Sequence, residues 1–282
     1  MQSTQLFSSS QPVSTITQVI AELEGIIDWS IENNSRIGYF AVLYHRVTCR
    51  IKDGIANNEF QDGPRMEKLD VLFALRYIDA WKAWISGQPL TQSWQVAFDA
   101  SKNGGTVILQ QMLLGINAHI NLDLGIATSE TVGSQGSIEN MLHDFDTINA
   151  ILASLVDEVQ KDLTQVSPLI RLVDKFGKGR QDKLATFSID IARTGAWYFS
   201  CLVHTCSTTD LPELIAERDA SIAKLASSLA KPKSWLLRSF VRIASWFEWR
   251  QPKVIIEKLR FVVQQQSGQT FVKRYFSKLI SR

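Results

Sequence analysis

Apolar residues recur every three to four positions over most of the chain, which is the period of an α-helix that buries one face. Between residues 14 and 31, for example, they fall at positions 16, 19, 20, 23, 26, 27 and 31. The same period predicts helices over 38–55, 62–85, 91–103, 105–122, 138–164, 168–176, 180–206, 211–230, 233–248 and 252–265. Seven prolines and fifteen glycines in 282 residues leave long stretches without a helix breaker. We therefore predict an all-α, multi-helix bundle.

Turn-forming residues mark several of the expected helix ends. Asp62-Gly-Pro64 is a helix start signal, and Gly87-Gln-Pro89 closes the same helix. The segment 125–136, with its Thr, Ser and Gly residues, is expected to be a loop. Ser137 then stands where it could cap the long helix that follows.

Composition indicates one globular unit with a distinct tail. The chain is 45% hydrophobic and 21% charged, which is ordinary for a globular protein. Residues 231–282 hold twelve basic and two acidic residues, so this segment has a net charge of about +10. The net charge of the whole chain is +2, so residues 1–230 have a net charge of about −8. We expect a flexible lead over 1–13, a single helical domain over 14–230, and a basic, aromatic-rich helical tail over 231–282.

The cysteines and the hydropathy indicate the cytoplasm. Cys49, Cys201 and Cys206 have neither the spacing of a metal site nor that of a secreted disulfide framework. The N-terminus lacks the pattern of a signal peptide, and no apolar run approaches the length of a membrane span. We therefore expect free thiols and a cytoplasmic protein that can attach peripherally to a membrane through its tail.

The segment Asn117-Ala-His-Ile-Asn-Leu-Asp123 places polar residues at the end of an apolar helical run. Polar side chains are costly to bury unless they are hydrogen-bonded or bind a ligand. His119 and Asp123 are four residues apart, so they share one helix face and should touch. Such a pair suits a metal site, a histidine–carboxylate proton relay or an internal polar contact.

A metal site would need ligands from a second segment. His143-Asp-Phe-Asp-Thr-Ile-Asn149 follows some twenty residues later, and Asp146 shares the helix face of His143. His119, Asp123, His143 and Asp146 could together furnish the nitrogen and oxygen ligands of a divalent transition metal.

The competing interpretation is structural. Asn117, His119, Asn121 and Asp123 could form a buried hydrogen-bond network that fixes neighbouring helices. Arg76 or Arg193 would then balance the charge of Asp123. The residues alone leave both interpretations open.

Five segments resemble a family of uncharacterised, mainly bacterial all-helical proteins with a domain of unknown function. These segments are 44–48, 65–80, 115–124, 143–149 and 192–197, and the most specific is the run Asn-Ala-His-Ile-Asn-x-Asp-Leu. The resemblance covers about 38–205 and implies a helical fold without implying an activity. It also implies that Asp144, Phe145, Ile148 and Asn149 form part of the family's core pattern.

The tail carries a second candidate function. Residues 231–250 interleave Lys and Arg with Trp and Phe, which is typical of a helix that lies on an anionic membrane surface. The same pattern suits a helix that docks on the acidic body, and we favour docking of the Trp235 and Trp246 face. Nucleic acid is the weaker alternative.

These observations favour an acid–base or metal-assisted enzyme, such as a hydrolase, that acts on a small apolar or lipid-like molecule. The alternative is a non-catalytic binding or scaffold protein whose basic tail contacts a membrane or an acidic partner. We expect the catalytic residues to be His119, Asp123 and Asp144. The expected ligand-binding residues are Asn117, Asn121, Asn149, Arg76, Arg193 and Trp197.

Overall fold

The protein is all-α, as the sequence pattern predicts. The structure, a computed structural model, describes residues 12–102, 106–148, 150–152, 155, 180–231, 245 and 251–260. Its main elements are α1 (Ile16–Glu32), α2 (Gly38–Ala56), α3 (Gly63–Ser86), α4 (Gln92–Lys102), α5 (Ile108–Ala118), the π-helix η1 (His119–Asp123), α6 (Leu124–Val132), the 3-10 helix η2 (Ile138–Met141), α9 (Arg180–Thr205) and α10 (Leu211–Ala230). Residues 142–148 and 252–260 are also helical.

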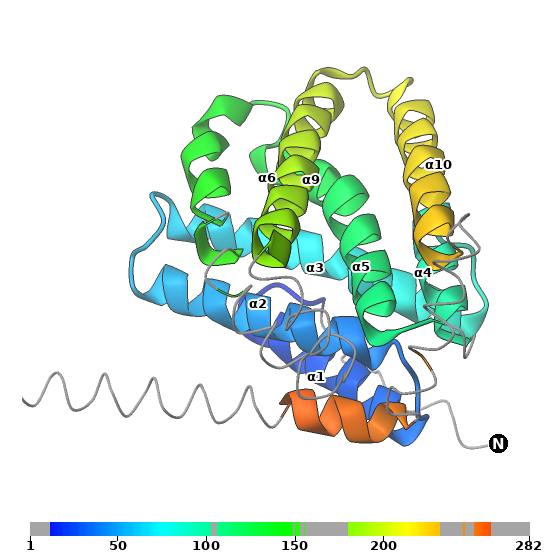
Figure 1. The fold of residues 1–282 in the computed structure, drawn as a ribbon. Helices are drawn as coiled ribbons and strands as arrows, with labels where there is room; N and C mark the ends of the chain where they lie inside the picture. Colours follow the sequence, from blue (N-terminus) through cyan, green and yellow to red (C-terminus); the bar gives the residue numbers. More distant parts are fainter. Residues whose placement is uncertain are drawn as a thin grey trace, which may run out of the picture.

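The helices form two groups that share one core. Helices α1, α2 and α3 pack against one another, and α5, α6, α9 and α10 stand across them (Figure 1). Contacts of α5 with α2, and of α6 with α3, join the two groups. The largest fully buried side chains include Trp81, Trp94, Tyr39, Tyr77 and Phe145. The core is therefore unusually aromatic where the two groups meet.

The ends of α3 follow the predicted signals. Asp62 accepts a hydrogen bond from the backbone N–H of Arg65 at 2.9 Å, and Pro64 occupies the first turn. At the other end Gly87 adopts a left-handed conformation with φ of 67°, which glycine accepts without steric cost.

Two local predictions are wrong. The segment expected to be a loop over 125–136 is mostly the helix α6, because its small Thr, Ser and Ala side chains are buried against α3 and α9. Tertiary packing has thus overridden a composition typical of loops. Ser137 makes no side-chain capping bond to a backbone N–H, and its hydroxyl instead pairs with the Glu139 carboxylate.

A short piece of the tail completes the core. Ile255, Ile256 and Leu259 are buried in the same apolar cluster as α1 and α2, and Figure 1 shows their helix in orange beside α1. Ile256 packs so closely on Gly38 that a Cβ at that position would collide with it. Arg260 also pairs with Asp28 at 2.5 Å. The predicted lead over 1–13 and the tail aromatics Trp235 and Trp246 fall outside the described residues, apart from residues 12 and 13.

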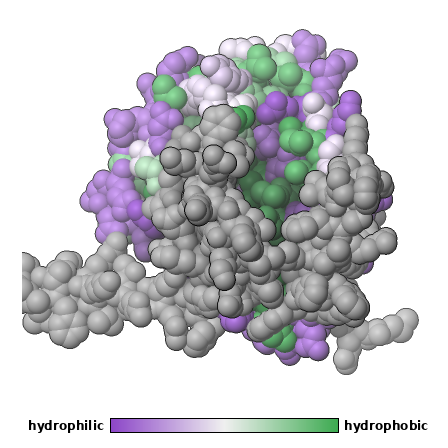
Figure 2. Space-filling view, viewed as in Figure 1, coloured by the Kyte–Doolittle hydropathy of each residue, from purple (hydrophilic) through white to green (hydrophobic). Residues whose placement is uncertain are grey.

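The described surface is not uniformly polar. Figure 2 shows apolar surface in green between α9 and α10. The exposed large apolar residues of α5, α9 and α10 are Leu109, Leu113, Ile191, Tyr198, Leu202 and Leu225. Among the described residues, no helix is both long and apolar enough to span a membrane.

We predict that Ile256→Ala lowers the free energy of unfolding by about 2 to 5 kcal/mol, because it removes a fully buried side chain from a closely packed contact. Chemical denaturation followed by circular dichroism measures this change. The matched control is Ile191→Ala, since Ile191 is 54% exposed on α9 and its truncation should change stability by less than about 0.5 kcal/mol. Equal effects of the two substitutions would show that residues 252–260 do not contribute to the core.

Candidate functional site

The segment with the polar residues is a π-helix inside a longer helical run. Helix α5 continues through η1 into α6, so residues 108–132 form one run whose middle turn is widened. A π-helix is rare and is often found at functional sites. The sequence predicted helix here but gave no signal for the widened turn.

The predicted contact between His119 and Asp123 is present in this turn. His119 Nδ1 lies 3.2 Å from Asp123 Oδ2, and both residues are buried. Asp123 Oδ2 also accepts a hydrogen bond from Trp94 Nε1 at 2.8 Å, and Oδ1 accepts one from Arg76 Nε at 3.0 Å. Arg76 therefore balances the charge of Asp123, which is one of the two partners expected from the sequence.

The carboxylate fixes the tautomer of His119. Because an ionised carboxylate can only accept, Nδ1 must carry the proton, and Nε2 of the neutral ring is then an acceptor. Burial lowers the pKa of His119 and outweighs the opposing effect of Asp123. The ring is therefore neutral near pH 7.

An aromatic cage surrounds the imidazole. Phe73 stacks on it with ring centroids 3.5 Å apart, and the Tyr44 ring meets it edge-on at 4.4 Å. Phe40, Tyr77 and Trp94 complete the cage, with ring centroids 5.8, 6.2 and 6.0 Å from that of His119. The cage excludes water and leaves the open nitrogen in an apolar setting.

Several buried polar atoms in this region have no hydrogen-bond partner. They are His119 Nε2, the hydroxyl oxygen of Tyr77 and both carboxyl oxygens of Asp70. The neighbouring hydroxyls of Tyr44 and Thr48 interact with each other. An unsatisfied buried polar group costs about 1 to 3 kcal/mol, so most such groups in native proteins are paired. Tyr44, Tyr77 and His119 bring their polar atoms together through ring contacts between α2, α3 and η1, and this is the observation that distinguishes the region as a site.

Burial also governs the protonation of these groups. It raises the pKa of Asp70 to about 8, with a further contribution from Glu67. Burial likewise raises the pKa values of Tyr44 and Tyr77, and the charges of Asp70 and Asp123 add to the effect on Tyr44. At pH 7 the carboxyl and both phenols are therefore protonated and can donate hydrogen bonds.

The two asparagines of the motif face α10 instead of the cage. Asn117 Nδ2 donates to the Ile222 carbonyl at 3.2 Å, and Asn121 Nδ2 donates to Asn117 Oδ1 at 3.1 Å. Arg218 Nε donates to the Asn121 carbonyl at 3.0 Å. The bond from Arg218 satisfies the backbone carbonyl of Asn121 in the π-helix, and together the bonds hold the helical run against α10.

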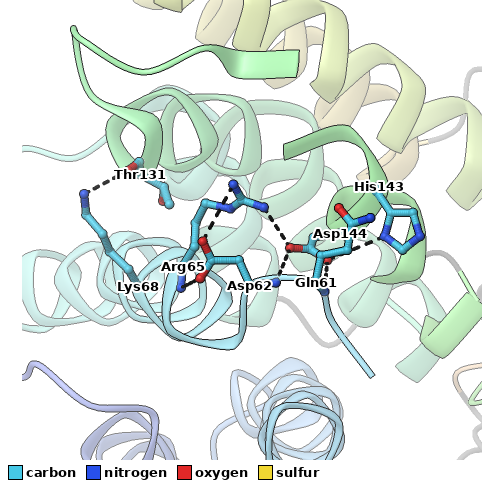
Figure 3. A network of polar contacts seen from close by, with 7 residues as sticks. All are labelled: Gln61, Asp62, Arg65, Lys68, Thr131, His143 and Asp144. Carbon is cyan, nitrogen blue, oxygen red and sulfur yellow. Dashed lines mark hydrogen bonds and ion pairs between the residues drawn. The ribbon is translucent and has the colours of Figure 1, made fainter. Parts of the chain in front are cut away.

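Asp144 belongs to a separate network at the start of α3 (Figure 3). Its buried carboxylate accepts hydrogen bonds from the backbone N–H groups of Gln61 and Asp62 at 2.7 and 3.1 Å, and from Arg65 Nη2 at 3.0 Å. Burial alone would raise the pKa of Asp144, but these donors lower it below its ordinary value. This geometry is that of a structural clamp on the loop between α2 and α3.

The four residues expected to share a metal ion do not converge. His119 is enclosed by the cage, whereas His143 is 61% exposed and lies 3.7 Å from Asp144. No group of three or more metal-ligating side chains occurs within the part of the chain that the structure describes. Helical periodicity shows which residues share a face of one helix, but it cannot show which faces of two distant helices meet. The sequence therefore could not exclude a metal site that joins the two segments.

The remaining predicted residues have other positions. Arg193 donates to the Phe145 carbonyl at 2.7 Å and lies over the Phe145 ring, so it does not balance Asp123. Trp197 is half-buried and packs on Phe145 with ring centroids 5.1 Å apart. Asn149 lies outside the described residues.

Sequence reasoning missed Tyr44, Thr48 and Asp70. A weak signal was available, because Asp70 falls at helical spacing within the apolar stripe that contains Met66 and Phe73. It also missed Asp219 of α10, which accepts hydrogen bonds from the backbone N–H groups of Gln92 and Ser93 at the start of α4.

A family of unknown function, DUF5995, matches residues 16–232. This range exceeds the 38–205 expected from the sequence motifs. No curated protein and no solved structure matches the chain.

We predict that Asp144→Asn destabilises the protein by about 2 kcal/mol at pH 7, because charge-assisted hydrogen bonds to buried backbone groups are lost. The lowered pKa means that the carboxylate stabilises the fold above its unfolded pKa of about 3.9, and that this contribution disappears as the pH falls through the folded value. Urea denaturation between pH 3 and pH 7 should therefore show a weaker pH dependence in the variant.

The control for this prediction is Asp53→Asn, because Asp53 is an exposed carboxylate on α2. It should change stability by less than about 0.5 kcal/mol. An unchanged unfolding free energy in Asp144→Asn would contradict a structural role for Asp144.

Proposed function

Because the chain belongs to a family of unknown function, DUF5995, we propose its function from the buried cluster: the protein binds a small, largely apolar molecule and acts on it by acid–base chemistry. His119 is the general base of this proposal. Asp123 orients the base, and the aromatic cage encloses the ligand. The observation that carries the proposal is the unpartnered Nε2 of His119 beside other unpartnered polar atoms.

A histidine held in this way suits proton abstraction. The hydrogen bond from Nδ1 to Asp123 fixes the ring and stabilises the imidazolium that forms when Nε2 accepts a proton. Arg76 and Trp94 hold the carboxylate itself in place. The base therefore needs no rearrangement when it receives the proton.

The surroundings indicate the kind of ligand. Ligand sites are generally lined by apolar and aromatic side chains with a few polar groups that fix orientation. Phe40, Phe73 and Trp94 supply the apolar walls, and Tyr44 and Tyr77 supply hydroxyl groups. His119 is only 2% exposed, so the helices must separate locally to admit a ligand, as lids do in many enzymes.

We predict that His119→Gln abolishes proton abstraction from a test ligand while leaving the fold intact, because a glutamine amide can still donate to Asp123 but offers no basic nitrogen. Cyclohexanone in D₂O is the probe, and NMR measures deuterium incorporation beside its carbonyl group. The wild-type protein should accelerate incorporation over buffer, and the variant should lose about 10² to 10⁴ of that acceleration.

The control variant is His45→Gln, which makes the same change on α2 at a histidine that pairs with Glu24. It should retain the wild-type exchange rate. If His119→Gln and wild type exchange at the same rate, or if the variant is strongly destabilised and neither protein shows bound probe, the cluster is structural.

The second candidate is a non-catalytic binding or scaffold protein, which we place in the cytoplasm. The full hydrogen bonding of Asp123 and Asp144 favours it, as does the apolar surface between α9 and α10. In that case the basic tail over 231–282 contacts an anionic membrane or an acidic protein. Sedimentation with vesicles rich in anionic lipid, at low and high salt, tests this alternative.

A further inference from the structure

Buried aspartates in this protein follow a rule with one exception. The described residues contain four of them, Asp70, Asp123, Asp144 and Asp219, each no more than 5% exposed. Three of the four carboxylates accept hydrogen bonds from at least two donors. Both oxygens of Asp70 lack a hydrogen-bond partner.

An isolated buried carboxylate is too unfavourable to persist in its charged form. Asp70 is therefore protonated at pH 7, in agreement with a pKa raised to about 8. A protonated carboxyl group has an O–H that can donate to a ligand. Perturbed acids of this kind are concentrated at functional sites.

The position of Asp70 connects it to the base. Asp70 lies three residues before Phe73 on α3, so the two side chains share a face one turn apart, and Phe73 stacks on His119 at 3.5 Å. Tyr44 is close to the base, since its ring centroid lies 4.4 Å from that of His119, and the charge of Asp70 raises the pKa of its hydroxyl group.

We propose that Asp70 is the proton donor of this site, opposite the acceptor Nε2 of His119, and that the ligand is a small neutral carbonyl compound held between α2 and α3. This inference rests on the function proposed above. The carbonyl oxygen faces the hydroxyl donors of Asp70 and Tyr44, and a carbon–hydrogen bond beside the carbonyl faces His119.

The charges of the site explain why the ligand is neutral. Asp123 is already balanced by Arg76 at 3.0 Å, and His119, Asp70 and the phenols are uncharged at pH 7. An anionic ligand would meet no unbalanced cation among the described side chains of the cage, and a cationic ligand would meet no unbalanced anion. Enclosing either would incur the full cost of burying a lone charge.

The reaction balances without a co-reactant. The C–H bond beside the carbonyl breaks, its proton goes to His119 Nε2, and its electron pair forms a carbon–carbon double bond. The carbonyl π electrons move to the oxygen, which takes the proton of Asp70. The product is the enol form of the ligand, with Asp70 as carboxylate and His119 as imidazolium. Return of a proton from His119 to the carbon and of the enol proton to Asp70 regenerates the ketone and both side chains, so the net chemistry is exchange of the proton beside the carbonyl.

Infrared spectroscopy tests the proton on Asp70 directly. At pH 7 the wild-type spectrum should contain the C=O stretch of a protonated carboxylic acid, and Asp70→Asn should lack this band. The matched control is Asp53→Asn, because Asp53 is exposed on α2, and it should keep the band. Absence of the band from the wild-type spectrum would overturn the proposal.

Addition of cyclohexanone tests the contact. The acid band of the wild-type protein should shift to lower frequency, because a hydrogen bond to the probe weakens the carboxyl group. The anion cyclohexanecarboxylate and the cation cyclohexylammonium should leave the band unchanged. A shift with the charged probes, or no shift with the ketone, would refute a neutral carbonyl ligand.

Deuterium incorporation separates this inference from the function on which it rests. Asp70→Asn should reduce the exchange of cyclohexanone by about 10²-fold or more, without lowering the melting temperature. If His119→Gln abolishes exchange and Asp70→Asn does not, His119 remains the base and the role of Asp70 is wrong. If neither variant changes the rate, the proposed function fails as well.

Discussion

The desolvation of carboxylates is the constraint on which this fold depends. A helical bundle offers few free donors in its interior, because its backbone N–H groups are already used within the helices. In this protein three of the buried aspartates lie beside N–H groups that are not used within a helix. Asp144 and Asp219 lie at the exposed N–H groups at the starts of α3 and α4, and Asp123 meets side-chain donors from both helices.

The positions of α3 and α4 therefore depend on residues that are distant in the chain. Each of these three aspartates receives donors from an element other than its own, so it fixes one element relative to another. Asp70 differs because, among the described residues, no donor reaches either of its oxygens, although it is buried on α3, the helix that supplies Phe73 and Tyr77 to the cage. Three carboxylates thus hold the scaffold in place, and the fourth keeps its proton in an apolar setting.

The sequence predicted what depends on local spacing. Helical periodicity placed the described helices other than α6 to within a few residues, and the four-residue spacing of His119 and Asp123 predicted their contact. It failed where the outcome depends on packing between distant elements. The donors of Asp144 come from residues 61–65, about eighty positions away, and hydrophobic periodicity gives no information about a contact over that separation. The grouping of His143 with His119 failed for the same reason.

The π-helix has a consequence for reading related sequences. A π-turn is equivalent to an α-helix with one residue inserted, so the chain before it and the chain after it are about 100° out of phase with a continuous helix. Here the insertion lets the helical run present His119 and Asp123 to the cage while Asn117, at the end of α5, and Asn121 face α10. A relative that aligns with a one-residue gap between 119 and 123 would regain the regular helical phase. It could keep every motif letter and still lack the site.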